Sequence, residues 1–145
     1  MISGGVAPNI PLAVQINGGT ASSAEIVAGA LRDANRAELM GETTYGTGTV
    51  LLEFPLTGGS ALMLAVEEWL TPDGHSFWHK GLSPEIKVSL PPDAAPLIPS
   101  AERDLNPASI KSADDRQLLT ALDWVTGQIQ RLNHKNEEAD LKPGD

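Results

Sequence analysis

The chain of 145 residues contains no cysteine, which excludes disulfide bonds, thiolate nucleophiles and cysteine-based zinc sites. Histidine is also scarce, with only His75, His79 and His134. The first two are four residues apart, but the preceding Asp73-Gly74 turn argues against a helix that would place them on one face as metal ligands. We therefore expect no metal site and no cofactor.

Basic residues and long apolar runs are likewise few. Ten lysines and arginines stand against 19 acidic residues, and the formal net charge is −9. Such a chain is not typical of proteins that bind nucleic acid or anionic membranes. No apolar run reaches the roughly 18 residues that a membrane span requires, and the first residues lack the basic and apolar regions of a secretory signal. We expect no nucleic-acid partner, no membrane span and no targeting signal in this chain.

Lysine is absent from the first half of the chain. The first lysine is Lys80, and before it the only basic side chains are Arg32 and Arg36. Chemistry that depends on a lysine within residues 1–79 is therefore excluded.

The chain divides by composition into four segments. Residues 1–90 alternate short apolar runs with glycine-rich turns and predict an α/β core. Residues 91–113 begin with four prolines in nine positions and predict an extended wrapping segment. Apolar residues at helical spacing predict a closing amphipathic helix over 114–134, and the polar residues 135–145 predict a flexible tail. Within the core we expect a helix after Thr20 and strands over 12–17, 38–40, 49–54, 61–70 and 85–90, the third and fourth of these strands forming a hairpin.

The junction at Ser22 is the segment most able to carry chemistry. A strand ending in Gly18-Gly19 turns directly into a helix, whose N-terminal N–H groups and dipole stabilise developing negative charge. Ser22 is therefore a candidate nucleophile. The alternative is structural, because Ser22 and Glu25 fit the S-x-x-E capping box, worth about 1 kcal/mol with no catalysis involved. From the pattern alone the capping interpretation is the commoner, and both stay open.

Four segments, in the same order, resemble those of the C-terminal processing, or tail-specific, serine peptidases. The segment LAVQINGGTASSAEIVAGALRD is similar to the nucleophile segment of that family. GETTYGTGTVL and LTPDGHSFWHKGLSPEIKV are similar to the two segments that follow it, and DDRQLLTALDWV is similar to the closing helix. The resemblance is collinear over residues 11–132.

The resemblance implies a Ser/Lys peptidase with an α/β fold, a Clp-protease/crotonase-like β-β-α core fragment with a C-terminal helix. It places the nucleophile at Ser22 and the general-base lysine at the position of Thr47. The glutamine that orients the lysine corresponds to Leu51, and Glu25 matches a family glutamate with a capping or orienting role. The resemblance therefore predicts hydrolysis of peptide bonds in protein substrates through Ser22.

Two of these positions depart from the family pattern. A threonine hydroxyl at position 47 has no useful proton affinity near neutral pH, and Leu51 cannot form hydrogen bonds through its side chain. Activity then depends on a substitute base, for which Lys80, His75 and His79 are the candidates. The alternative function is a catalytically inactive pseudo-peptidase that acts as a peptide-binding or assembly module.

Partners and location follow from the same resemblance. We expect a polypeptide substrate or a peptide C-terminus as ligand. The motifs match the C-terminal part of a catalytic core, so the N-terminal half of that core and a PDZ domain are expected partners, with a homodimer as an alternative. Family members act mostly outside the cytoplasm, which predicts a periplasmic or secreted location.

Overall fold

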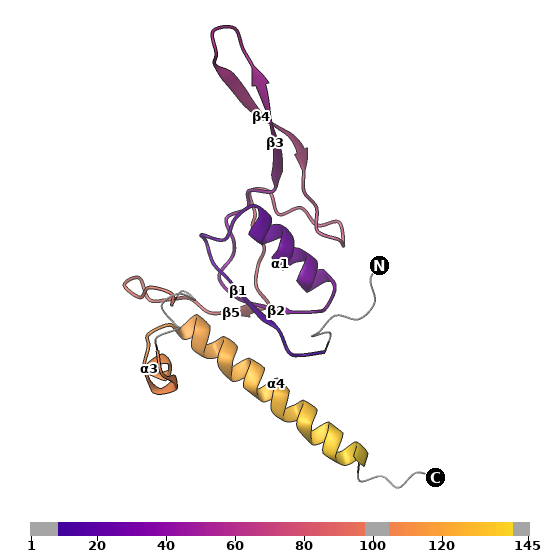
Figure 1. Cartoon of the computed structure of the whole chain (residues 1–145), viewed down its shortest axis with the longest axis vertical. Coiled ribbons are helices and arrows are strands. Elements are labelled where there is room, and N and C mark those ends of the chain that lie inside the picture. The colour runs from indigo at the N-terminus through magenta and orange to yellow at the C-terminus, as the bar shows by residue number, and fades with distance from the viewer. Residues whose placement is uncertain (1–8, 98–104, 141–145) are drawn as a thin grey trace. The chain divides into compact units, whose positions relative to one another are not determined.

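The computed structural model describes residues 9–97 and 105–140, with side chains up to residue 137 (Figure 1). The chain forms two compact units. One is Val14–Lys87, and the other combines Val88–Asp145 with Met1–Ala13. Each unit is described by itself.

The first unit holds the α/β core that the sequence predicts, which confirms the fold class. Its elements follow the expected order: β1 (Ala13–Ile16), α1 (Ser23–Asp33), β2 (Glu38–Gly41), β3 (Thr49–Pro55), β4 (Ala61–Glu68) and β5 (Ile86–Lys87). Strand β5 has only two residues, fewer than the expected 85–90. Prolines at positions 84 and 91 flank it, and a proline cannot donate a ladder hydrogen bond.

Strands β1, β2 and β5 form a three-stranded sheet in that order. β2 and β5 run parallel, with Met40 opposite Ile86. The core of this unit is a cluster of five buried residues, Ile16, Ala28, Leu39, Phe77 and Leu82, against which Val14 and Ile26 pack. Phe77 belongs to the long loop before β5, so its burial anchors that loop to the core.

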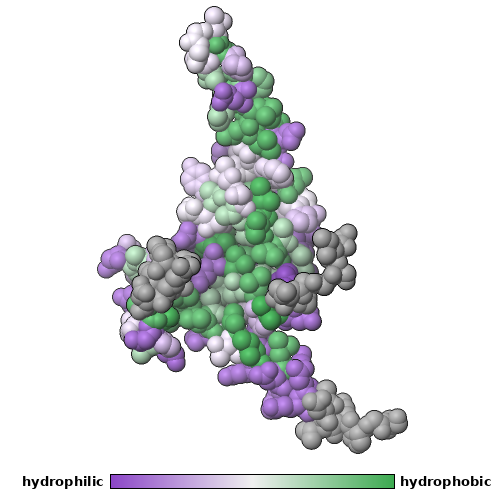
Figure 2. All heavy atoms as spheres, viewed as in Figure 1, coloured by the Kyte–Doolittle hydropathy of each residue, from purple (hydrophilic) through white to green (hydrophobic). Residues whose placement is uncertain are grey.

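Strands β3 and β4 form a separate antiparallel hairpin, as predicted. Leu52 pairs with Leu64 and Phe54 with Leu62, so the alternation of a strand places all four side chains on one face. These side chains are between 42% and 51% exposed, and Figure 2 shows apolar surface along the hairpin. We call these four residues the hairpin face. Contiguous exposed apolar patches are common at the interaction sites of proteins.

The second unit contains two helices, α3 (Pro107–Lys111) and α4 (Arg116–Asp140). Helix α3 lies inside the segment 91–113 that we expected to be extended throughout. Its signals are Asn106, whose side chain caps the helix by accepting from the N–H of Ser109 at 2.9 Å, and proline at the first helical position. Residues 98–104 of the proline-rich segment lie outside the described residues.

The start of α4 is held by two buried polar side chains. Asp115 Oδ1 accepts from the N–H of Leu118 at 2.9 Å, and its Oδ2 accepts from the N–H of Leu97 at 2.7 Å. Gln117 Nε2 donates to the carbonyl of Val88 at 2.9 Å. The proline-rich segment is thereby tied to the first turn of the helix.

The end of α4 differs from the prediction. The helix continues to Asp140, six residues past the predicted end at residue 134. Glutamate and alanine in this stretch favour helices, and neither glycine nor proline occurs before Pro143. The rest of the predicted tail, 141–145, lies outside the described residues. In the part of the chain that the structure describes, no helix is long and apolar enough to cross a membrane.

Candidate active site

Ser22 occupies a strained turn between the first strand and α1. Its backbone has φ 56° and ψ −123°, in a region that costs a residue with a side chain about 1–3 kcal/mol. The side chain is exposed. A sharp, strained strand-to-helix turn that presents a serine is the geometry of a nucleophile elbow.

Ser22 and Glu25 form the capping box that the sequence predicts. Glu25 Oε2 accepts from the N–H of Ser22 at 2.9 Å. The N–H of Glu25, the other donor of the box, also donates to the backbone carbonyl of Ser22 at 2.9 Å. The capping interpretation is therefore confirmed, and Ser22 is at the same time exposed.

Glu25 is a fully buried carboxylate, 0% exposed, that accepts four hydrogen bonds. Oε2 accepts from the N–H groups of Ser22 and Thr47, each at 2.9 Å. Oε1 accepts from the N–H of Gly46 at 2.7 Å and from the Thr44 hydroxyl. One side chain therefore joins the start of α1 to the loop between β2 and β3.

This carboxylate brings two predicted site positions together. The backbone nitrogens of Ser22 and Thr47 both lie 2.9 Å from one oxygen atom, so they cannot be farther apart than twice that distance. Thr47 is half-buried and offers a hydroxyl where the family has an amine. Leu51 lies farther along, in β3 opposite Ala65, and its side chain is 52% exposed. The backbones of the predicted nucleophile and base positions are therefore close together. Leu51 makes no polar contact through its apolar side chain.

The loop that carries Thr47 is packed too tightly to move freely. Gly46 has φ 87°, and a Cβ there would lie 2.7 Å from the nitrogen of Gly81. Gly48 has φ 48°, and a Cβ there would lie 2.9 Å from the Cα of Trp78. Both glycines beside Thr47 are therefore required by the close approach of the segment from Phe77 to Gly81, which we call the facing turn.

Thr44 is a site residue that sequence reasoning missed. It is buried, its hydroxyl donates to Glu25, and the same oxygen accepts from the N–H of Leu82 at 2.7 Å. Its neighbour Thr43 is exposed. Nothing in the sequence distinguishes the two threonines, because the difference arises from contacts with residues about 20 and 40 positions away.

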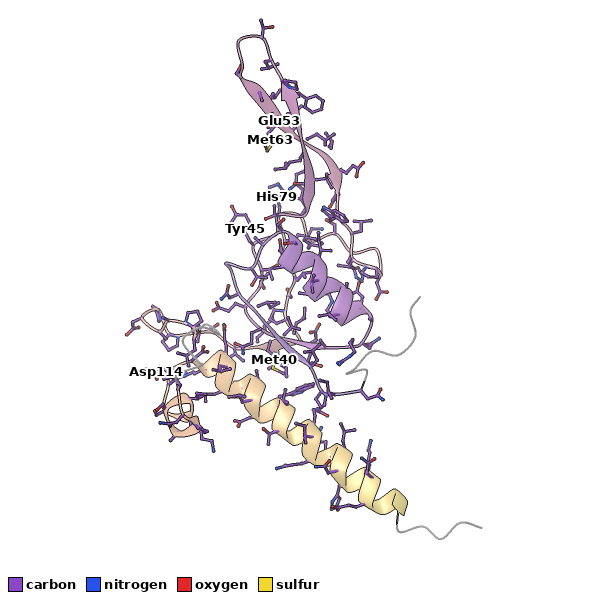
Figure 3. The ribbon with its side chains drawn as sticks, in the orientation of Figure 1. Met40, Tyr45, Glu53, Met63, His79 and Asp114 are labelled. Atoms are coloured by element: carbon purple, nitrogen blue, oxygen red, sulfur yellow. The ribbon has the colours of Figure 1, made fainter. Side chains whose placement is uncertain are left out.

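The three candidate substitute bases lie in two regions of the first unit. His79 and Lys80 lie in the facing turn, where the N–H of His79 donates to the carbonyl of Gly46 at 2.9 Å. Figure 3 labels His79 and also Tyr45, the residue before Gly46. His75 lines a cavity of about 470 Å³ together with Asp33, the last residue of α1. Eleven helical residues separate the two ends of α1 by about 16 Å, so His75 lies away from Ser22.

Asp33 fastens the C-terminal end of α1. Burial alone would raise the pKa of Asp33, but hydrogen bonds from the Thr71 side chain, the Asp73 backbone and Arg32 outweigh it and hold the pKa below its ordinary value. The N–H of Asp73 and the Nε of Arg32 each lie 3.0 Å from this carboxylate. These hydrogen bonds give Asp33 a structural role, which is to attach the end of α1 to the loop that carries Thr71 and Asp73.

A second hollow opens beside the serine turn. It measures about 460 Å³ and is lined by β1 and the first half of α1. Its walls include the apolar side chains of Val14, Val27 and Ala28, and it reaches Ser23, the residue after Ser22. We call it the β1–α1 groove. An apolar side chain bound there would lie close to the Ser22 turn.

Within the described ranges, no three histidine, aspartate or glutamate side chains lie close enough together to hold a metal ion.

The chain is similar to proteins of one peptidase family. The sequence model of Peptidase family S41 matches residues 3–88. A carboxyl-terminal-processing protease of Synechocystis sp. is 38% identical over 134 residues, which cover 92% of this chain and 28% of that protein. The carboxy-terminal processing protease CtpA of Bacillus subtilis is 46% identical over 81 residues, covering 56% of this chain and 17% of that protein.

A solved structure agrees. The photosystem II D1 C-terminal processing protease superposes on 57% of this chain and 22% of its own length, with a TM-score of 0.52 and 38% identity. The chain spans less than a third of the length of these relatives. The match of the family model includes Ser22, Glu25 and Thr47. The chain therefore belongs to peptidase family S41, the family of the C-terminal processing serine peptidases.

Proposed function

We propose that this chain hydrolyses peptide bonds in protein substrates, with Ser22 as the nucleophile. The observation that carries the proposal is the backbone of Ser22, which is held at φ 56° and ψ −123° in an exposed turn at the start of α1. A strained conformation persists only where the surroundings enforce it, and such strain concentrates at active sites. Here the buried carboxylate of Glu25 holds the backbone of Ser22 by accepting a hydrogen bond from its N–H.

The backbone after Ser22 supports the same chemistry. In a nucleophile elbow, the N–H of the residue following the serine contributes to the oxyanion hole. Among the described residues, the N–H of Ser23 has no acceptor, whereas the next N–H, that of Ala24, donates to Ala21 at 3.2 Å. Ser23 N–H is therefore available to an oxyanion formed on a substrate at Ser22.

The test is covalent labelling with a fluorophosphonate, read by intact mass and peptide mapping. We expect one adduct, on Ser22. Ser22→Ala abolishes it, whereas Ser23→Ala, which removes the neighbouring exposed hydroxyl but keeps the Ser23 N–H, preserves it. An unlabelled wild-type chain, or equal labelling of Ser22→Ala, overturns the proposal.

Thr47 favours a second candidate, an inactive peptide-binding module. Without the lysine, the site retains the β1–α1 groove and the donor at Ser23, which suffice to hold a peptide. Binding of C-terminal peptides to a wild-type chain that forms no adduct supports this candidate. Cleavage of those peptides contradicts it.

The partners and location that we propose rest on exposed surface and on the relatives. Relatives are named for processing carboxyl termini, so the proposed ligand is the C-terminal segment of a protein substrate. The exposed hairpin face and the β1 edge suit an upstream half of a catalytic core, which we propose as a partner together with a PDZ domain. From the similarity to C-terminal processing proteases we also propose a location outside the cytoplasm.

A further inference from the structure

We infer that His79 is the general base that deprotonates Ser22, taking the role for which Thr47 is unsuited. The inference rests on the proposed function, since it assigns a second catalytic residue to the same site. Three observations carry it: the connection of His79 to the Ser22 turn, the strain in its backbone, and the chemistry of the side chains present.

The connection runs through hydrogen bonds only. Ser22 and Thr47 share one oxygen of Glu25, and Gly46, which precedes Thr47, accepts the N–H of His79 at 2.9 Å. Gly46 is itself fixed, because its N–H donates to Glu25 at 2.7 Å. His79 is thus attached to the residue beside the base position, and that position is attached to the nucleophile.

Backbone strain singles out the same two residues. Among the described residues, three that are not glycine have positive φ: Ser22, Asn35 and His79. Asn35, at φ 50°, follows the end of α1, where asparagine in the left-handed conformation is a common helix ending. Ser22 and His79, both at φ 56°, stand at turn positions that glycine usually occupies, in turns closed by the N–H of Ala24 on Ala21 and the N–H of Lys80 on Phe77, each at 3.2 Å. Two strained residues joined by one buried carboxylate and one loop are typical of a functional site.

The imidazole is supported by its neighbour in the chain. Its ring stacks on Trp78, with centroids 4.6 Å apart and planes inclined by 34°. Trp78 in turn abuts Gly48, on the far side of Thr47. The facing turn therefore contacts both neighbours of Thr47 and leaves His79 exposed beside them. Because threonine is much shorter than lysine, the side chain of Thr47 does not fill the space that a lysine at this position would occupy.

The side-chain chemistry favours His79 over its neighbour. A lysine acts as a base only where burial disfavours its charged form, and Lys80 is exposed. A histidine needs no such burial, because imidazole changes protonation between about pH 5 and 8. The threonine hydroxyl of residue 47 can donate or accept a hydrogen bond but cannot hold the proton.

The proposed step balances as follows. As Ser22 Oγ forms a bond to the scissile carbonyl carbon, its proton passes to the imidazole of His79. The resulting imidazolium gives that proton to the departing amine as the C–N bond breaks, which leaves an acyl ester on Ser22. Water then loses a proton to the neutral imidazole and attacks the ester, and the proton returns to Ser22 Oγ.

The test measures the rate of fluorophosphonate labelling of Ser22 in the whole chain and in His79→Gly. Loss of a general base costs roughly 10²–10⁴-fold in rate, so we expect labelling to slow at least 100-fold. Glycine adopts φ 56° without strain, so this variant keeps the fold, which circular dichroism checks. It also vacates the place of the ring, and added imidazole restores labelling in proportion to its concentration.

Matched variants distinguish the outcomes. His75→Ala, which removes a histidine at the other end of α1, and Lys80→Ala label at the wild-type rate. Undiminished labelling of His79→Gly, slowing that imidazole does not reverse, or loss of labelling in Lys80→Ala each overturns the assignment of His79 while leaving Ser22 as nucleophile. A wild-type chain that is never labelled overturns the proposed function and this inference together.

Discussion

The backbone N–H of Thr47 donates to the buried carboxylate of Glu25 at 2.9 Å, across 22 positions of sequence. Because this bond uses the backbone only, it holds residue 47 beside the Ser22 turn whatever side chain residue 47 carries. A change of side chain at this position therefore alters the chemical groups near Ser22 without removing the hydrogen bond that positions the loop.

Glu25→Gln is expected to destabilise the fold by about 2–4 kcal/mol, because hydrogen bonds to a charged group contribute roughly 1.5–3 kcal/mol each. The substituted amide turns an NH₂ group toward N–H donors that the carboxylate accepted from both oxygens. Urea denaturation measures the change. Glu67→Gln, on the exposed hairpin, is the control and should stay within about 0.5 kcal/mol of wild type. Equal midpoints for the two variants contradict the role assigned to Glu25.

Thr44→Val tests the hydroxyl that sequence reasoning missed. Valine has nearly the shape of threonine but leaves Glu25 without one donor and the Leu82 N–H without an acceptor. We expect a loss of about 1–3 kcal/mol in the free energy of unfolding. Thr44→Ser keeps the hydroxyl and should retain most of the stability, and Thr43→Val, on the exposed neighbour, should have little effect. Similar losses for Thr43→Val and Thr44→Val argue against the assignment.

Local periodicity predicted β1, α1, β2 and the hairpin because each buries or pairs residues close in sequence. The capping-box spacing also marked Glu25, but no local pattern shows that its carboxylate reaches residues 44–47, since that contact is set by tertiary packing. The positive φ of Ser22 and His79 arises in short turns, and because neither residue is the glycine that such turn positions usually contain, the sequence did not reveal it. Asn106 and Pro107 are typical of a helix start and could have predicted α3. The four prolines at residues 91–99 led instead to the prediction of a wrapping segment.

Acid should weaken the attachment of the loop at the end of α1. The pKa of Asp33 is lowered in the folded chain, so this carboxylate stabilises the fold above the unfolded value of about 3.9. That contribution is lost as the pH falls from there through the lower folded value. In Asp33→Asn the corresponding part of the acid dependence should disappear, and the variant should be less stable at pH 7. Thermal melts between about pH 2.5 and 7 measure both. Parallel curves for the two proteins contradict the assignment.

The hairpin face should drive association when nothing covers it. Leu52→Lys places a charge among the four apolar side chains and is expected to shift sedimentation toward the monomer. Glu53→Lys adds a lysine at the next position, on the opposite face, and should leave the association state unchanged. A wild-type chain that is monomeric at all concentrations leaves the upstream half of a catalytic core as the proposed occupant, and excludes a second copy. Association that is equal in all three proteins shows that another surface is responsible.

Thr47→Lys should restore the amine that the family places beside the nucleophile. Because the backbone of residue 47 is held by Glu25 and flanked by Gly46 and Gly48, a lysine there starts from the position that the motif requires. We expect faster labelling of Ser22 by fluorophosphonate, and the gain should persist when His79→Gly is added, since the lysine then acts alone. Thr47→Arg is the control, because a guanidinium carries the same charge but cannot be deprotonated in proteins. Equal rates for the lysine and arginine variants would mean that charge alone acts on the site, and no gain with either would mean that residue 47 is not the position of the lost base.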